Sequence, residues 1–83
     1  MTRSEAAKKA INAAGGISIV AEMLERHIKR VRPDEPMSFD RAYFRVNAWQ
    51  RNGIPAVYAD WMSKRQGEVS KHQMYPEVFR NGE

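Results

Sequence analysis

The four residues of the stretch 52–55, Asn-Gly-Ile-Pro, separate two helical patterns and constrain the fold of this chain more than any other segment. Glycine accepts the left-handed backbone that closes a helix, so Gly53 predicts a helix end. Proline suits the first turn of a helix, where its missing N–H costs nothing, so Pro55 predicts a helix start. Before this junction three apolar residues follow the i, i+4, i+7 spacing of one buried helical face, namely Ala42, Val46 and Trp49. The sequence therefore predicts two helices joined by a short corner.

The opposite face of the helix before that corner is polar and basic. It carries Arg41, Phe44, Arg45, Asn47, Ala48 and Arg51. Arginine and asparagine on a short helix can reach guanine and adenine edges in the major groove of DNA. Basic helical faces are also common as plain solvated surface. Both interpretations stay open at this point.

The length and the net charge of the chain limit the classes of protein to which it can belong. The 83 residues predict one domain, and the formal net charge of +4 with a pI near 9.8 favours an anionic partner such as nucleic acid. The chain has no cysteine, which excludes disulfides, thiol nucleophiles and cysteine zinc sites and fits a reducing cytosol. No apolar run is long enough to cross a membrane, and residues 1–5 lack the apolar core of a signal peptide.

Two further helices are predicted before the basic one. Ser4 is the expected cap of the first, which runs to Ala14 and ends at Gly15-Gly16. Its expected apolar stripe is Ala6, Ala7, Ala10, Ile11 and Ala14. Ser18 is the expected cap of the second, which continues to about Arg30. Its expected stripe is Ile17, Val20, Ala21, Leu24 and Ile28.

A loop at residues 32–36 separates these helices from the rest, because its two prolines and two acids oppose a helix. Ser38 is the expected cap of the third helix, residues 39–51. The fourth is expected to start at Pro55 and to end near Gly67, with the pairs Val57–Trp61 and Tyr58–Met62 on its buried side. Ser70 is expected to cap a short turn through Met74. The apolar residues after it, Tyr75, Val78 and Phe79, are expected either to cover the core or to pair with a second copy of the chain.

No arrangement of residues indicates catalysis or a metal site, so an enzyme, a cofactor and a small-molecule substrate are not expected. The one suggestive pair, Glu68 and His72, is more simply surface at a helix end. Trp49, Tyr58 and Trp61 could stack on single-stranded bases, but their helical spacing favours the core. The candidate phosphate contacts are Ser18, Lys29, Arg30 and Lys64. Lys29 and Arg30 are equally well explained by the dipole of the helix that they end.

Several motifs in order resemble a known family. They are Ala13-Ala14-Gly15-Gly16, Val20-Ala21 with Leu24, Val46 with Trp49, Gly53-Ile54-Pro55-Ala56, Val69-Ser70-Lys71-His72 and Pro76-Glu77-Val78-Phe79. This order is similar to that of the Cro-like and YdaS-like helix-turn-helix proteins of phages and prophages, and it covers most of the chain. Each motif is weak by itself, and their order together is moderately specific.

The sequence departs from the family between the second and third helices. The interval between the residues that match Ala21 and Trp49 is longer by roughly fifteen residues than a compact helix-turn-helix allows. Glu25 stands where the family has a glycine after Leu24. We therefore expect an all-α bundle of four to five helices with an inserted segment, residues 25–38. Its first part continues the second helix to about Arg30, and residues 32–37 replace the tight turn.

The resemblance implies a transcriptional regulator of a phage or prophage, acting in the bacterial cytoplasm on operator DNA, usually as a homodimer. It implies that residues 39–51 are the recognition helix. By position, the groove-facing residues that it implies are Tyr43, Phe44, Asn47, Ala48 and Arg51. Arg41 and Arg45 join them from the helical wheel alone. Phe44 is expected either to touch a thymine methyl group or, in the interpretation we favour slightly, to pack on the inserted loop.

The expected function is therefore that of a sequence-specific duplex-DNA-binding repressor or similar regulator. The main alternative is a protein-interaction module, such as an antitoxin-like or host-factor-inhibiting phage protein that has adapted the scaffold. The insertion and Phe44 are the features that favour the alternative. The sequence identifies neither the operator nor the direction of regulation.

Overall fold

The computed structural model of the chain describes residues 2–75, and every regular element within that range is an α-helix. The helices are α1 (Arg3–Ala13), α2 (Ile17–Val31), α3 (Phe39–Asn52), α4 (Ala56–Ser63) and α5 (Lys71–Met74). The expected all-α bundle of four to five helices is confirmed. The expected extension is confirmed too, since α2 continues to Val31 and residues 32–38 connect it to α3.

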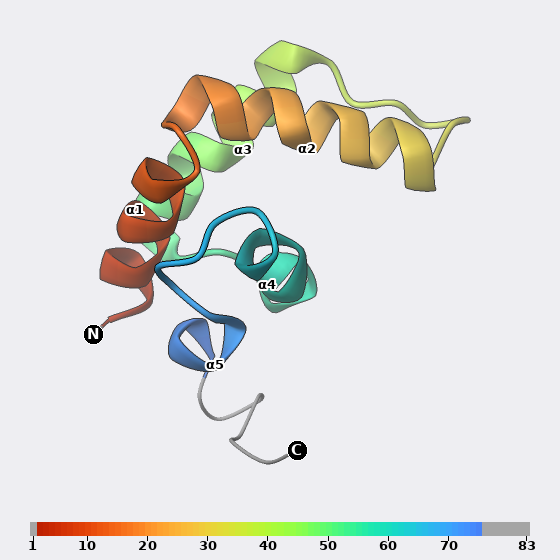
Figure 1. Cartoon of the computed structure of the whole chain (residues 1–83). Coiled ribbons are helices and arrows are strands. Elements are labelled where there is room, and N and C mark those ends of the chain that lie inside the picture. Colours follow the sequence, from red (N-terminus) through yellow and green to blue (C-terminus); the bar gives the residue numbers. More distant parts are fainter. Residues whose placement is uncertain (1, 76–83) are drawn as a thin grey trace.

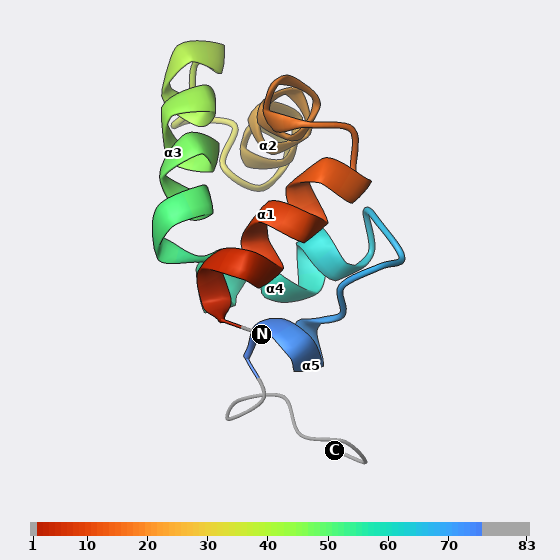
Figure 2. The same cartoon turned by 90° about the vertical axis from the view of Figure 1, so that its left-hand side faces the viewer.

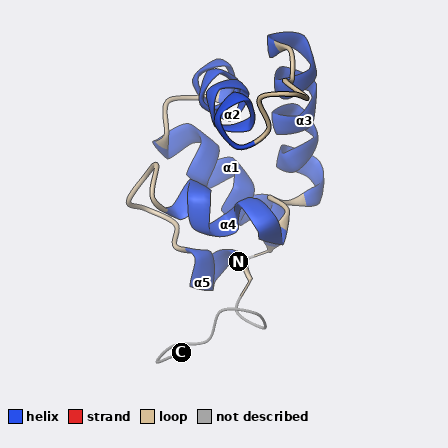
Figure 3. Ribbon diagram, turned by 90° about the vertical axis from the view of Figure 1, so that its right-hand side faces the viewer, coloured by secondary structure: helices blue, strands red, loops and turns tan. Residues whose placement is uncertain are grey.

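The helices enclose one core without forming parallel layers. In Figure 1, α2 lies across the top of the bundle, and its C-terminal half extends beyond the other helices. Figure 2 shows α3 beside both α1 and α2, which are its contact partners. Figure 3 shows α4 below α2. The short α5 contacts α4 and α1 and closes the bottom of the bundle.

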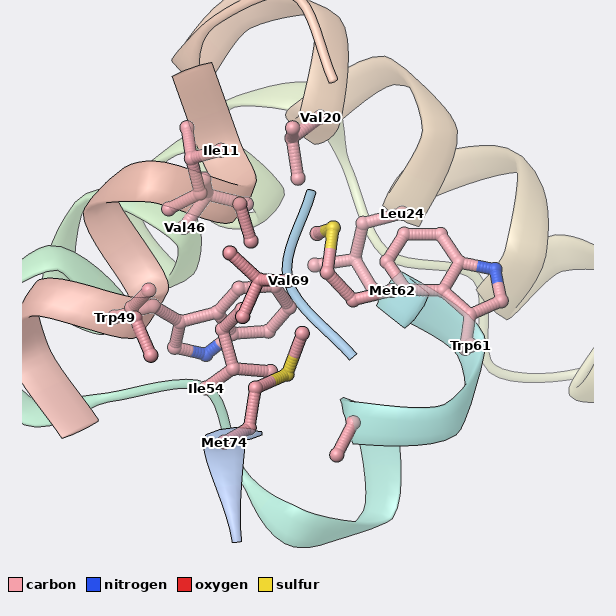
Figure 4. Close-up of a cluster of buried hydrophobic side chains, with 14 of the residues drawn as sticks. Ile11, Val20, Leu24, Val46, Trp49, Ile54, Trp61, Met62, Val69 and Met74 are labelled. Atoms are coloured by element: carbon pink, nitrogen blue, oxygen red, sulfur yellow. The ribbon is translucent and has the colours of Figure 1, made fainter. Parts of the chain in front are cut away.

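Side chains from every helix meet in the core (Figure 4). The largest of those that are fully buried are Ile11, Leu24, Ile54, Met62, Val20, Val46 and Val69. Small residues occupy the buried side of α1, where Ala6, Ala7 and Ala10 have no exposed surface. Since alanine adds little width, α3 can approach α1 closely, and the expected stripes of α1, α2 and α3 are all buried at their centres.

Helix α1 begins with a different cap from the expected one. The Thr2 hydroxyl oxygen accepts a 3.0 Å hydrogen bond from the Glu5 amide, and the Glu5 carboxylate accepts one of 2.9 Å from the Thr2 amide. This reciprocal capping box satisfies two amides that the helix leaves unpaired. The expectation that Ser4 caps α1 is wrong, because Ser4 already lies in the first turn.

Helix α2 also begins earlier than expected. Gly16 is its N-terminal flanking residue, with φ 106° and ψ 175°, and no side chain caps the helix. The expectation that Ser18 is the cap is wrong. The two glycines at 15 and 16 take backbone angles open mainly to glycine, so the chain turns at once and Ile17 is already helical.

Helix α4 is shorter than expected, and one of its expected pairs does not form. It ends at Ser63, and Val57 is 82% exposed while Trp61 is 8% exposed. The chain turns away because Gln66 is buried and bonds to the backbone around it. Its amide nitrogen donates to the carbonyls of Met62 and Val69, and its side-chain oxygen accepts from the amides of Glu68 and Val69. This turn brings Val69 into the core.

The expected cap of α5 is confirmed, since the Ser70 hydroxyl oxygen accepts a 3.3 Å hydrogen bond from the Gln73 amide. Tyr75, which follows α5, is 9% exposed and belongs to the core. The Arg3 guanidinium carbon lies 4.5 Å from the centre of its ring. Tyr75 therefore covers the core, as one of the two expectations for the tail had it, while Val78 and Phe79 lie outside the described residues.

Candidate nucleic-acid interface

One apolar side fixes α3 to the rest of the bundle. Ala42, Val46 and Trp49 are buried, as predicted, where α3 contacts α1 and α2. The ring of Trp49 lies 5.4 Å from that of Tyr58 on α4, centre to centre. At the start of α3 the Ser38 hydroxyl oxygen accepts a 3.3 Å hydrogen bond from the Arg41 amide, as expected of a cap. Helix α3 is therefore held along its whole length.

A second set of contacts fixes the C-terminal end of α3 to the start of α1. The Ser4 hydroxyl donates a 2.7 Å hydrogen bond to the carbonyl oxygen of Gln50. Gly53 closes α3 with φ 93°, and a Cβ atom built on it would lie 2.8 Å from the Cβ of Arg3. A close approach of this kind needs glycine. The predicted helix end at Gly53 is thus confirmed, and α1 is its packing partner.

The outward face of α3 carries the predicted basic residues. Arg41, Arg45 and Arg51 are exposed, and none of them forms an ion pair with another residue of the range 2–75. A shallow groove of about 480 Å³ runs along this face, lined by Arg41, Phe44, Arg45, Ala48 and Trp49. Four predicted base-contact residues and the core residue Trp49 therefore line one groove on the surface of α3.

Phe44 is the most exposed aromatic residue among those described. Its side chain is 71% exposed, although large apolar side chains are normally covered. The interpretation that it packs on the inserted loop is wrong. Residues 32–38 lie on α2 and on the flank of α3 that carries Arg41 and Arg45, so they leave Phe44 uncovered.

The remaining predicted base contacts lie farther round α3. Asn47 is half-buried, and Arg51 is exposed one turn later. Tyr43 is 40% exposed, and its ring lies 6.1 Å from that of Phe39. Asp40, in the first turn, is exposed as well and adds a negative charge to the start of the helix. The middle and C-terminal half of α3 is thus its more basic part.

The connection between α2 and α3 adds to the basic surface. A hollow of about 330 Å³ lies between the end of α2, the connection, α3 and α4. Its charged lining residues are Arg32, Glu35, Arg41 and Arg45. Arg41 and Arg45 therefore border two hollows, one on each side, and Arg32 of the inserted segment comes next to them.

The predicted phosphate contacts do not form one cluster. Ser18 lies in the first turn of α2, whereas Lys29 and Arg30 lie in its last turn, so they are separated by about 16 Å along the axis. All three are exposed. Lys64, after α4, lies 3.1 Å from the Asp60 carboxylate, which partly neutralises it. Of the four, only Arg30 and Lys64 line a common hollow.

Beside Arg30 lie Arg26, His27 and Arg65, which were not among the contacts predicted from the sequence. They belong to a hollow of about 260 Å³ between α2 and α4, called the α2–α4 hollow below, which is lined by Met23, Arg26, His27, Arg30, Trp61 and Arg65. The i, i+4 spacing of Arg26 and Arg30 was visible in the sequence. The approach of Arg65 was not, because it depends on how α4 packs below α2.

The surroundings of this hollow lower the pKa of His27. Burial lowers its pKa below the ordinary value of 6.5, and the positive charges of Arg30 and Arg65 lower it further. Its ring lies 5.2 Å from that of Trp61 and 6.3 Å from that of Tyr58. The ring of His27 thus packs α2 against α4, and the charged side chains nearby favour its neutral form.

Within residues 2–75, no three histidine or acidic side chains gather as the ligands of a metal ion would, and the pair Glu68–His72 gains no third member there. None of the helices in that range has both the length and the apolar composition that crossing a membrane requires.

Comparisons of this chain with protein-family models, with curated proteins and with solved structures find no match. The geometry of the helices and of their exposed side chains is therefore the basis for inferring its function.

Proposed function

We propose that this protein binds duplex DNA through the exposed face of α3 and acts as a sequence-selective transcriptional regulator. The observation that carries the proposal is the set of three arginines without ion-pair partners among residues 2–75, Arg41, Arg45 and Arg51, on a helix whose other side is buried. Charges placed on a rigid, outward-facing helix can contact phosphates and base edges together. The motif order, which resembles that of Cro-like and YdaS-like regulators, supports the same role.

The size of α3 suits the major groove. Its 14 residues span about 21 Å, and the groove is about 12 Å wide, enough to admit one helix. Asn47 and Arg51 are one turn apart, so both side chains can reach neighbouring base pairs. Asparagine bonds adenine through two atoms, and arginine bonds guanine in the same way. Phe44, being uncovered, is available for a thymine methyl group.

The other arginines have a positioning role in this proposal. Arg41 and Arg45 lie on the flank toward the connection, next to Arg32. From that flank they meet phosphates beside the groove, and each such contact releases counterions. Asp40 opposes binding at the N-terminal end of α3, because its carboxylate is exposed and negative.

The test compares a selected binding site with a scrambled duplex. Asn47→Ala and Arg51→Ala should each lose about 1–3 kcal/mol of discrimination between the two, because a bidentate base contact is worth that much. Arg45→Gln should instead weaken both complexes alike and reduce the salt slope by about one unit. Fluorescence anisotropy at several salt concentrations gives both quantities. An unchanged specific-to-random ratio in both alanine variants would remove α3 as the recognition helix.

A protein-interaction module is the second candidate. It is favoured by the exposure of Phe44 beside a groove that Ala48 and Trp49 also line. Aromatic anchors beside arginine are typical of the centres of protein interfaces. Affinity for random duplex at low salt distinguishes the two. DNA binding predicts measurable affinity that falls steeply with salt, whereas a pure protein-binding surface predicts none. In that case Phe44→Ala would reduce binding to the protein partner.

A further inference from the structure

The α2–α4 hollow concentrates positive charge away from the face of α3. Its three arginines, Arg26, Arg30 and Arg65, form no ion pair with any residue from 2 to 75. The neighbouring hollow, of about 390 Å³, shares Arg30 and Arg65 and adds Lys64 and Asp60. The Asp60 carboxylate cannot neutralise the arginines, because Lys64 and Lys71 each lie 3.1 Å from it.

Aromatic rings fix the position of this charge. Trp61 is 8% exposed, and the His27 ring lies 5.2 Å from it. The guanidinium carbon of Arg65 lies 5.5 Å from the centre of the Trp61 ring, within the range of a cation–π interaction. Arg65 is thereby oriented next to α2, where Arg26 and Arg30 are one turn apart. Three arginines, two from α2 and one from the turn after α4, thus line one hollow although like charges repel.

We propose that the α2–α4 hollow binds a phosphate group. The planar fork of arginine matches phosphate oxygens in pairs, and guanidinium groups on both sides of a hollow can share one phosphate. A volume of about 260 Å³ admits a phosphate group with its attached ester. The group comes either from a free phosphate-bearing molecule or from the backbone of duplex DNA. This site does not depend on base contacts by α3.

Binding of phosphate here changes the charge around His27. In the free protein the charged groups nearest the ring are Arg26 and Arg30 on α2 and Arg65, with Lys64 and Asp60 in the adjoining hollow. Arg30 and Arg65 lower the pKa of His27. A bound phosphate offsets their charge, so the pKa of His27 rises when the site is occupied, and protons are taken up on binding.

The first experiment titrates the whole chain with inorganic phosphate and follows Trp61 and His27 by NMR, with chloride at matched ionic strength as the reference. The proposal predicts saturable shifts at both residues, little change at Trp49, and a higher pKa for His27 at saturation. Arg30→Gln and Arg65→Gln should weaken binding several-fold. Lys9→Gln, which removes an exposed charge from α1, is the matched control and should not.

Circular dichroism shows whether the variants remain folded. Where Arg65→Gln disturbs the packing of Trp61, Arg26→Gln provides the test, since Arg26 is exposed. Arg65→Lys keeps the charge and loses the fork, so it should bind phosphate less well than the parent chain. Shifts that do not saturate, or that are the same in chloride, or a loss in Lys9→Gln equal to that in Arg30→Gln, would overturn the proposal.

A second experiment identifies the source of the phosphate. If the DNA backbone supplies it, Arg26→Gln and Arg30→Gln each reduce the salt slope of duplex binding by about one unit, and inorganic phosphate competes with duplex. If a free molecule supplies it, both variants keep the slope and lose only the phosphate titration. Either result leaves the base selectivity of Asn47 and Arg51 unchanged, so this proposal and that for α3 fail independently.

Discussion

At Gly53 the backbone has φ 93° and ψ 159°, a combination that residues with a Cβ atom avoid, and α1 fills the space where a Cβ would lie. A single residue thus sets the corner between α3 and α4. Gln66 has a comparable effect at the end of α4, where one buried side-chain amide bonds to four backbone groups of three residues.

We expect Gly53→Ala to lower the free energy of unfolding by more than about 1–3 kcal/mol, because strained backbone and a clash with Arg3 add together. Gly67→Ala is the matched control, since a Cβ there would meet nothing within 4 Å. It should be neutral or stabilise by up to about 1 kcal/mol. Urea denaturation measures both, and equal stability of the two variants would contradict the role given to Gly53.

Replacing Gln66 by leucine should destabilise the fold by about 1–3 kcal/mol, because the buried amide of Val69 and the part-buried amide of Glu68 lose their acceptor. Gln73→Leu removes an exposed side chain that makes a similar bond to the Ser70 amide, and it should cost less. The comparison by thermal unfolding isolates the effect of burial. A larger loss in Gln73→Leu than in Gln66→Leu would show that the turn after α4 forms without Gln66.

At the scale of the element, α3 combines two opposite requirements. One side must be apolar to pack on α1 and α2, and the other carries the exposed residues of the candidate interface. The helical period separates the two, so that Trp49 is 5% exposed while Phe44, five residues earlier, is 71% exposed. The same sequence motif therefore serves the core and the candidate interface without conflict.

Two aromatic substitutions on this one helix should have very different effects. Trp49→Ala should cost about 3–5 kcal/mol, which is enough to unfold a domain of this size. Phe44→Ala should change stability by less than about 0.5 kcal/mol, because its side chain contributes little to the core. Melting temperatures of the two variants test the expectation. A near-normal melting temperature for Trp49→Ala would show that this side of α3 does not hold the bundle together.

At the scale of the whole molecule, three groups among residues 2–75 have lowered pKa values and make stability depend on pH. Glu5 is one of them, because the hydrogen bonds from Thr2 in the capping box lower its pKa below 4.5. His27 lies between α2 and α4, and burial with Arg30 and Arg65 lowers its pKa below 6.5. Asp60 is on α4, and hydrogen bonds from Lys71 of α5 and from Lys64 lower its pKa below 3.8. His27 and Asp60 therefore link the protonation state to the packing of α4.

The unfolded chain binds a proton at His27 at a higher pH than the folded chain does. The free energy of unfolding should thus fall as the pH falls from 6.5 through the depressed pKa of folded His27. A second loss should follow below 4.5, as the carboxylates of Glu5 and Asp60 are protonated. His27→Gln should flatten the first step alone, and Asp60→Asn should reduce the second while the contribution of Glu5 remains. Urea midpoints across this pH range, in a phosphate-free buffer, measure both, and a first step that persists in His27→Gln would contradict the assignment.

The sequence by itself determined that the fold is an all-α bundle of four to five helices, most of the helix ends and the buried side of α3. These follow from local rules, namely the helical period of apolar residues, the capping preference of Ser38 and Ser70, and the conformational freedom of Gly53. Such rules act within a few residues, so they can be read without any knowledge of the fold. The candidate face of α3 was predictable for the same reason, since one side of a helix defines the other.

Tertiary structure decided what depends on residues far apart in the chain. The early end of α4 required the burial of Gln66, and the exposure of Phe44 depended on where residues 32–38 lie. The α2–α4 hollow could not be predicted, because Arg65 and Arg30 are 35 positions apart and meet only through the packing of Trp61 on His27. Periodicity describes one helix at a time, whereas the positions of charges across two helices are set by the core between them.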